Sequence, residues 1–134
     1  MGTTLGPFAG LKAVFFDLDG TLVDSARDIH RSLAIALRDL GLRTVSEPQV
    51  RHWVGRGASR LVDCTIKSLG ADPALHAPLL AQFMLRYQAN VCVDSEVYDG
   101  VIDCLEYCQA QQLHLACITN KPLLPAKTLL SQLN

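Results

Sequence analysis

The fold is decided by one stretch near the N-terminus, Leu11-Lys12-Ala13-Val14-Phe15-Phe16-Asp17-Leu18-Asp19-Gly20-Thr21. Its apolar part, which ends at Phe16, predicts a short buried strand. Asp17 and Asp19 follow, and side chains two residues apart on a strand point to the same side. Gly20 frees the backbone there, so both acids can face one small volume. Because ligands of open α/β sheets bind beyond the carboxyl ends of the strands, we expect a binding site at this edge.

A second apolar run, at residues 113–119, predicts another buried strand that pairs in parallel with the first through a right-handed connection. Apolar residues recur at helical spacing through residues 22–98, which we predict to contain helices only. The sequence therefore predicts an α/β fold. We expect residues 1–21 and 99–134 to form the first part of a Rossmannoid parallel-sheet core, and residues 22–98 to form an inserted α-helical cap.

Two of the predicted helices have recognisable starts. Ser25 is a candidate N-cap, and Asp28 three residues later completes a pattern like a capping box. Asp72 precedes Pro73, which is typical of an N-cap followed by proline at the first helical position.

Composition excludes several classes of function. A chain of 134 residues has the length of about one domain, and a hydrophobic content of 49% is ample for a core. The net charge of −1 offers no basic surface for nucleic acid and no polybasic patch for a membrane. The apolar runs are too short to span a membrane and no signal-peptide pattern is present, so we expect a cytoplasmic protein. The five scattered cysteines form no C-x-x-C pair, which argues against zinc and favours buried free thiols.

Two motifs carry a family resemblance. The sequence from Asp17 to Thr21 resembles the first motif of the haloacid dehalogenase-like hydrolases, and the sequence from Ile118 to Pro122 is similar to their second motif, TNKP. Residues 54–58 resemble the cap loop of the phosphoglycolate phosphatases in this family. Residues 98–101 are similar to their YPGV return to the core, with Asp99 in place of the usual proline. By this resemblance, the third-motif lysine and the fourth-motif acid would lie beyond Asn134.

The paired acids suit phosphate-ester hydrolysis. Asp17 is the candidate nucleophile, because a carboxylate can attack phosphorus and form an aspartyl-phosphate. Asp19 is the candidate general acid and base, which protonates the leaving oxygen and later activates water. Both are candidate ligands of Mg²⁺, a cation that prefers oxygen. The resemblance implies that Asp17 supplies a carboxylate oxygen and Asp19 its backbone carbonyl. An EF-hand is excluded because Gly20 falls at position 4 of such a loop and not at position 6.

Further candidates lie around the second motif and in the cap. Thr119 and Asn120 precede a helix start, where a hydroxyl and a backbone N–H suit a phosphate oxygen; a simple turn is the alternative. Arg56 is the candidate for binding a substrate carboxylate, with Arg51 and Arg60 as alternatives and a solvated arginine as the competing interpretation. Lys121 is predicted to be structural or solvent-exposed. The four histidines have no partner at catalytic spacing and are predicted to be structural.

The resemblance implies a Mg²⁺-dependent phosphatase that hydrolyses 2-phosphoglycolate to glycolate and phosphate through an aspartyl-phosphate. A sugar-phosphate phosphatase or phosphomutase of the same family is the first alternative. A catalytically incompetent fragment is the second, with the missing half of the core supplied by the rest of the protein or by another chain. Because the distal motifs are absent, we expect the isolated chain to have little or no activity.

Overall fold

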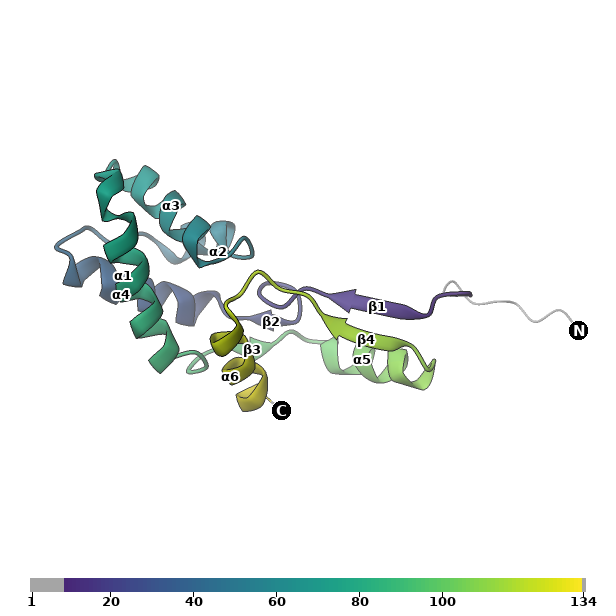
Figure 1. The fold of residues 1–134 in the computed structure, drawn as a ribbon. Coiled ribbons are helices and arrows are strands. Elements are labelled where there is room, and N and C mark those ends of the chain that lie inside the picture. Colours follow the sequence, from purple (N-terminus) through teal and green to yellow (C-terminus); the bar gives the residue numbers. More distant parts are fainter. Residues whose placement is uncertain (1–8, 134) are drawn as a thin grey trace, which may run out of the picture.

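The computed structural model describes residues 9–133, in which a small parallel sheet supports one end of a helical unit. Strand β1 (Ala13–Phe16) pairs in parallel with β4 (His114–Cys117), with Ala13 opposite His114 and Phe16 opposite Cys117. Helix α5 (Val101–Ala110) precedes β4 and packs against it (Figure 1). The parallel pairing predicted from the two apolar runs is confirmed, and with it the α/β class.

Four helices form what we call the helical unit: α1 (Ala26–Asp39), α2 (Glu47–Trp53), α3 (Ala58–Leu69) and α4 (His76–Ala89). Pro73–Leu75 form a 3₁₀ turn before α4, which Asp72 caps by accepting a hydrogen bond from the Ala74 N–H. A capping box opens α2, because Ser46 and Gln49 each satisfy the other's backbone N–H. The left-handed Gly70 ends α3.

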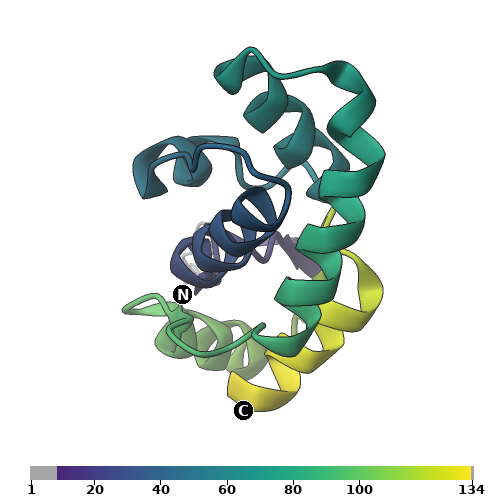
Figure 2. The same ribbon diagram turned by 90° about the vertical axis from the view of Figure 1, so that its left-hand side faces the viewer.

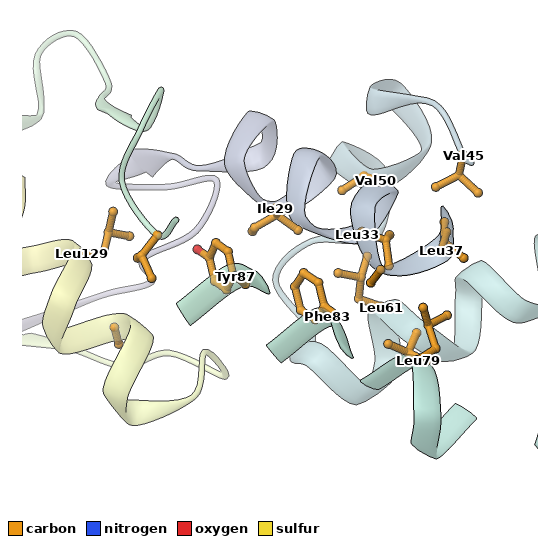
Figure 3. Close-up of a cluster of buried hydrophobic side chains, with 14 of the residues drawn as sticks. Ile29, Leu33, Leu37, Val45, Val50, Leu61, Leu79, Phe83, Tyr87 and Leu129 are labelled. Atoms are coloured by element: carbon orange, nitrogen blue, oxygen red, sulfur yellow. The ribbon is translucent and has the colours of Figure 1, made fainter. Parts of the chain in front are cut away.

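Apolar stripes of these helices meet in one core. Helix α1 packs along α4, which also contacts α3. Figure 3 shows side chains from α1, α3 and α4 converging, with Phe83 and Tyr87 of α4 stacked at 5.5 Å between ring centres. The last helix, α6 (Leu123–Leu133), lies beside α4 (Figure 2), and its buried Leu129 extends the core toward the sheet. The core therefore lies mainly in the helical unit.

Residues 22–98 do not contain helices only, so that prediction was wrong. Strand β2 (Val23–Asp24) pairs antiparallel with β3 (Glu96–Val97), and the Tyr98 N–H donates to the Leu22 carbonyl. These two-residue strands are the places where the chain enters and leaves the helical unit. A strand this short has no room for an alternating pattern, which is why its sequence did not reveal it.

The predicted capping box at the start of α1 was also wrong. Ser25 occupies the N-cap position, but its side chain makes no capping hydrogen bond and donates to Asp19 instead. Asp28 is fully buried and accepts hydrogen bonds from the Val93 N–H, the Asp94 N–H and the Ser95 hydroxyl. Partners far along the chain replaced the local partners that the pattern indicated.

The two strands are less buried than their apolar sequences predicted. Phe15 of β1 is 67% exposed, and Ile118 just after β4 is 60% exposed. In the described part of the chain the sheet has two strands, and the helices pack mostly on one another. The expectation of buried thiols fails similarly for Cys104 and Cys117, which are exposed, whereas Cys108 is buried. Among the described residues, no helix is both long and apolar enough to cross a membrane.

Candidate active site

The acidic loop and the second motif meet at the carboxyl ends of β1 and β4. Because these strands are parallel and adjacent, the residues that follow each one leave the sheet at the same edge. The acidic loop is tightly wound: the Leu18 carbonyl accepts from the N–H groups of Thr21, Leu22 and Val23, and Leu18 is fully buried. Gly20 has a φ of 81°, a left-handed conformation that favours glycine. The turn therefore brings Asp17 and Asp19 out of the strand beside residues 119–121.

The two acids have different surroundings. Asp17 is exposed, and its Oδ1 accepts a hydrogen bond of 2.8 Å from the Leu18 N–H. The Asp19 side chain is only 8% exposed, and its Oδ1 accepts from the Ser25 hydroxyl at 2.5 Å and from Lys121 Nζ at 2.9 Å. Asp17 is thus open to an incoming ligand, whereas Asp19 is held in one orientation.

Lys121 is buried, so the prediction of a solvent-exposed side chain was wrong and only the structural alternative remains. Its side chain is 2% exposed and forms an ion pair with Asp19. Nζ also donates to the hydroxyl of Tyr87 in α4 and lies 4.5 Å from the centre of that ring. Burial lowers the pKa of Lys121, although Asp19 opposes that shift. Burial raises the pKa of Tyr87, and the nearby Asp19 raises it further.

The other second-motif residues face the loop that joins α2 to α3. The Thr119 hydroxyl accepts a hydrogen bond of 3.0 Å from the Lys121 N–H, which forms a local turn. The Asn120 side chain donates to the Gly55 carbonyl at 3.0 Å. Gly57 has a φ of 88°, and a Cβ built there would lie 3.4 Å from the Asn120 carbonyl oxygen. Glycine therefore permits the close approach of this loop to the sheet edge.

The three candidate arginines lie in different settings. Arg56 is exposed and forms no ion pair with any residue that the structure describes. Arg51 pairs with Asp24 and Glu47 at 2.8 and 3.0 Å, and these carboxylates raise its pKa. Arg60 lies 3.8 Å from Asp63. Of the three, Arg56 alone keeps its guanidinium unpaired within the described chain.

A hollow lies between the sheet edge and the helical unit. Its polar lining consists of Asp19, Tyr87 and Lys121. The rest of its wall is apolar or glycine and comes from α1, α3, α4 and the loop between α2 and α3, with Pro122 at one side: Ile29, Val54, Gly55, Gly57, Ala58, Leu61, Phe83 and Met84. Asp17, Arg56, Thr119 and Asn120 do not line it. The hollow joins a carboxylate and an ammonium to an apolar wall, a combination typical of small-ligand sites.

Comparison with known protein families identifies the family of this chain. The profile of the haloacid dehalogenase-like hydrolases matches residues 11–134. The chain belongs to this family.

Relatives of the chain within the haloacid dehalogenase-like hydrolases are named phosphoglycolate phosphatase. The chain is 35% identical over 127 residues to a phosphoglycolate phosphatase of Colwellia psychrerythraea, covering 91% of this chain and 56% of the relative. It is 39% identical over 116 residues to one of Rhodobacter capsulatus, covering 85% and 52%. The crystal structure of a predicted phosphoglycolate phosphatase from Haemophilus somnus 129pt superposes with a TM-score of 0.80 at 35% identity, covering 92% and 58%. The chain thus spans about half the length of the relatives it matches.

The donor atoms at this edge of the haloacid dehalogenase-like fold fit part of a Mg²⁺ site. Within residues 9–133, no three or more His, Cys, Asp or Glu side chains gather as metal ligands. The described hydrogen bonds leave Asp17 Oδ2 and the Asp19 backbone carbonyl without a donor. Mg²⁺ is commonly bound by one or two carboxylates, with waters and substrate phosphate completing its shell. These two oxygens fit that pattern, whereas Asp19 Oδ1 is occupied by Lys121 and Ser25.

Sequence reasoning missed the two groups that complete the polar lining of the hollow. Tyr87 has the helical spacing of a core residue and gave no signal of a polar role. Lys121 sits within the second motif, but nothing local indicated that its ammonium would be buried against α4. Both assignments needed the packing of α4 onto the sheet edge.

Proposed function

We propose that the protein is a Mg²⁺-dependent phosphatase that hydrolyses 2-phosphoglycolate through an aspartyl-phosphate. The observation that carries this proposal is the exposed Asp17 beside the anchored Asp19, at a sheet edge shared with Thr119 and Asn120. Family membership and relatives named phosphoglycolate phosphatase support it. Because the chain spans only about half the length of those relatives, the activity of the whole enzyme is part of the proposal.

In the first step, a carboxylate oxygen of Asp17 attacks phosphorus and the bond from phosphorus to the ester oxygen breaks. In this step Asp19 is protonated on Oδ2, the oxygen that accepts from neither Ser25 nor Lys121, and it gives that proton to the leaving oxygen, which releases glycolate. The Thr119 hydroxyl and the backbone N–H groups before α6 are the proposed donors to the phosphoryl oxygens. The exposure of Asp17 allows an ester to reach it, and the two hydrogen bonds to Asp19 fix the proton donor.

In the second step, the Asp19 carboxylate takes a proton from a water molecule that attacks the aspartyl-phosphate. The bond from phosphorus to Asp17 breaks, phosphate leaves, and both acids return to their starting states. Mg²⁺, bound by an Asp17 oxygen and the Asp19 carbonyl, would neutralise charge on the phosphoryl group. The helical unit is the proposed cap, which would exclude water from the site.

Arg56 is the proposed contact for the carboxylate of the substrate. Its guanidinium is unpaired within the described chain. Arg56 directly follows Gly55, whose carbonyl accepts a hydrogen bond from the Asn120 side chain. It lies outside the hollow in this structure, so the loop at residues 54–58 would have to turn it inward on binding. Its exposed neighbour Arg60 offers a matched substitution.

The test measures phosphate release from 2-phosphoglycolate with Mg²⁺ present, at enzyme concentrations high enough to detect a single turnover. Wild type is expected to release phosphate. Asp17→Asn should release none. Equal rates for both proteins would overturn the mechanism, and preference for hexose phosphates in a panel of esters would overturn the substrate. Arg56→Gln should raise KM for 2-phosphoglycolate more than Arg60→Gln does.

A further inference from the structure

We propose that Lys121 is a positioning residue that links Asp19 to Tyr87, so that one of the two hydrogen bonds that orient Asp19 is secured only while α4 lies against the sheet edge. This inference rests on the proposed function for its catalytic consequence. The linkage itself is a property of the folded chain and can be tested without turnover.

The contacts of the Lys121 ammonium carry the inference. An ammonium has three N–H donors, and two are used here, one on Asp19 Oδ1 at 2.9 Å and one on the Tyr87 hydroxyl. The Lys121 side chain is 2% exposed, so water does not compete for these bonds. Within the described chain, Asp19 and Tyr87 form no hydrogen bond with each other. Lys121 is therefore the group that joins them by hydrogen bonds.

The three residues come from separate parts of the fold. Asp19 follows β1, Lys121 follows β4, and Tyr87 lies near the end of α4 in the helical unit. Figure 3 shows the Tyr87 ring between Phe83 and Leu129. Movement of α4 away from the edge would remove both the hydroxyl and the ring face from the ammonium. Lys121 would then be more hydrated, and its bond to Asp19 would compete with water.

A second contact joins the same segment to the helical unit. Asn120 donates to the Gly55 carbonyl at 3.0 Å, and Gly57 approaches the Asn120 backbone. Two successive residues after β4 thus contact the helical unit, Asn120 at the loop between α2 and α3 and Lys121 at α4. Only the Lys121 contact continues to a candidate catalytic acid. A purely structural role for Lys121 would stabilise the fold without making Asp19 sensitive to Tyr87.

The first experiment measures that sensitivity in urea unfolding. The effect of Tyr87→Phe on the unfolding equilibrium constant is measured with Asp19 and with Asp19→Asn, and both measurements are repeated with Lys121→Met. With Lys121 present, the factor by which Tyr87→Phe changes the unfolding equilibrium constant should differ about fivefold between Asp19 and Asp19→Asn, as expected for residues in one network. With Lys121→Met, that dependence should disappear. Lys121→Gln replaces Lys121→Met if the latter does not fold.

The second experiment separates positioning from stability under the proposed function. Tyr87→Phe should lower kcat for 2-phosphoglycolate by about tenfold and leave KM within about twofold, because it loosens a group that assists proton transfer. Lys121→Met should lower kcat at least as much, and adding Tyr87→Phe to it should cause no further loss. Matched controls are Lys127→Met and Tyr98→Phe, which remove an exposed ammonium and a phenol outside the hollow.

The outcomes are distinguishable. An effect of Tyr87→Phe that is independent of Asp19, or one that persists unchanged with Lys121→Met, overturns the linkage whether or not the protein turns over. Turnover with additive losses for Tyr87→Phe and Lys121→Met also overturns it. Where the 134-residue chain hydrolyses no phosphate ester, the unfolding measurements alone decide the linkage.

Discussion

Replacing Asp28 with alanine should destabilise the protein by about 3–5 kcal/mol, the cost typical of removing one partner from a buried, charged hydrogen-bond network. Asp28 is fully buried in α1 and accepts from the Val93 N–H at 3.0 Å, the Asp94 N–H at 2.9 Å and the Ser95 hydroxyl at 2.7 Å. It also accepts from Arg31 at 2.8 Å.

The size of this loss in unfolding free energy depends on how many of these donors become hydrated after the substitution. Hydrogen bonds to a charged acceptor contribute about 1.5–3 kcal/mol each. Val93 and Asp94 are exposed residues and Arg31 is half exposed, so their donors can be partly rehydrated. The Ser95 hydroxyl is buried and keeps one longer contact, to the Val91 carbonyl at 3.4 Å. The largely uncompensated loss at Ser95 and the three partial losses sum to the stated range.

The assay is urea unfolding followed by circular dichroism, with the slope m expected to stay unchanged. Asp28→Asn should cost about 2 kcal/mol, because the amide keeps one acceptor oxygen but turns an NH₂ group toward donors. Asp94→Asn is the matched control. It removes a 43% exposed acid that pairs with the same arginine, and it should cost less than about 1 kcal/mol.

Hydrogen exchange gives a local readout of the same change. The amides of Val93 and Asp94 should lose protection in Asp28→Ala, since both donate to the missing carboxylate. If Asp28→Ala unfolds within about 1 kcal/mol of wild type, with those amides still protected, the reasoning is refuted. Asp28 would then not be what holds residues 93–95 against α1.

Three further predictions concern the site. Gly57→Ala should destabilise the protein by more than about 1 kcal/mol, because a φ of 88° strains an L-residue and the new Cβ would lie 3.4 Å from the Asn120 carbonyl oxygen. Thermal unfolding checks this, with Gly70→Ala as the control whose new Cβ would meet nothing within 4 Å. Since burial raises the pKa of Tyr87 above its ordinary value of about 10, the folded state holds that proton more tightly, and stability present below pH 10 should fall as the pH rises further. Tyr87→Phe should flatten that alkaline loss in urea titrations, and an equally steep loss would contradict it. Chelation of Mg²⁺ should abolish phosphate release in the same assay and Mg²⁺ should restore it, so release that persists in a chelator would exclude the metal.

The local patterns predicted the elements that position the candidate site. The apolar run before Asp17 and the one before Thr119 became β1 and β4, and parallel pairing placed their following residues at one edge. Helical periodicity found the helices of residues 22–98, and the motifs indicated the family that the profile match established. These predictions succeeded because strand alternation, helical spacing and glycine turns depend on neighbours in sequence.

Tertiary structure alone decided what each polar side chain contacts. Lys121 meets an acid 102 residues earlier and a phenol 34 residues earlier, and Asp28 meets backbone groups 65 residues later. No short window of sequence contains both members of such a pair. Burial decided the rest, because a lysine or aspartate removed from water must find partners wherever the packed chain supplies them. The sequence by itself determined that Asp17 and Asp19 stand at a sheet edge, and the packing of α4 onto that edge decided that Asp19 is held by Lys121 while Asp17 is left open.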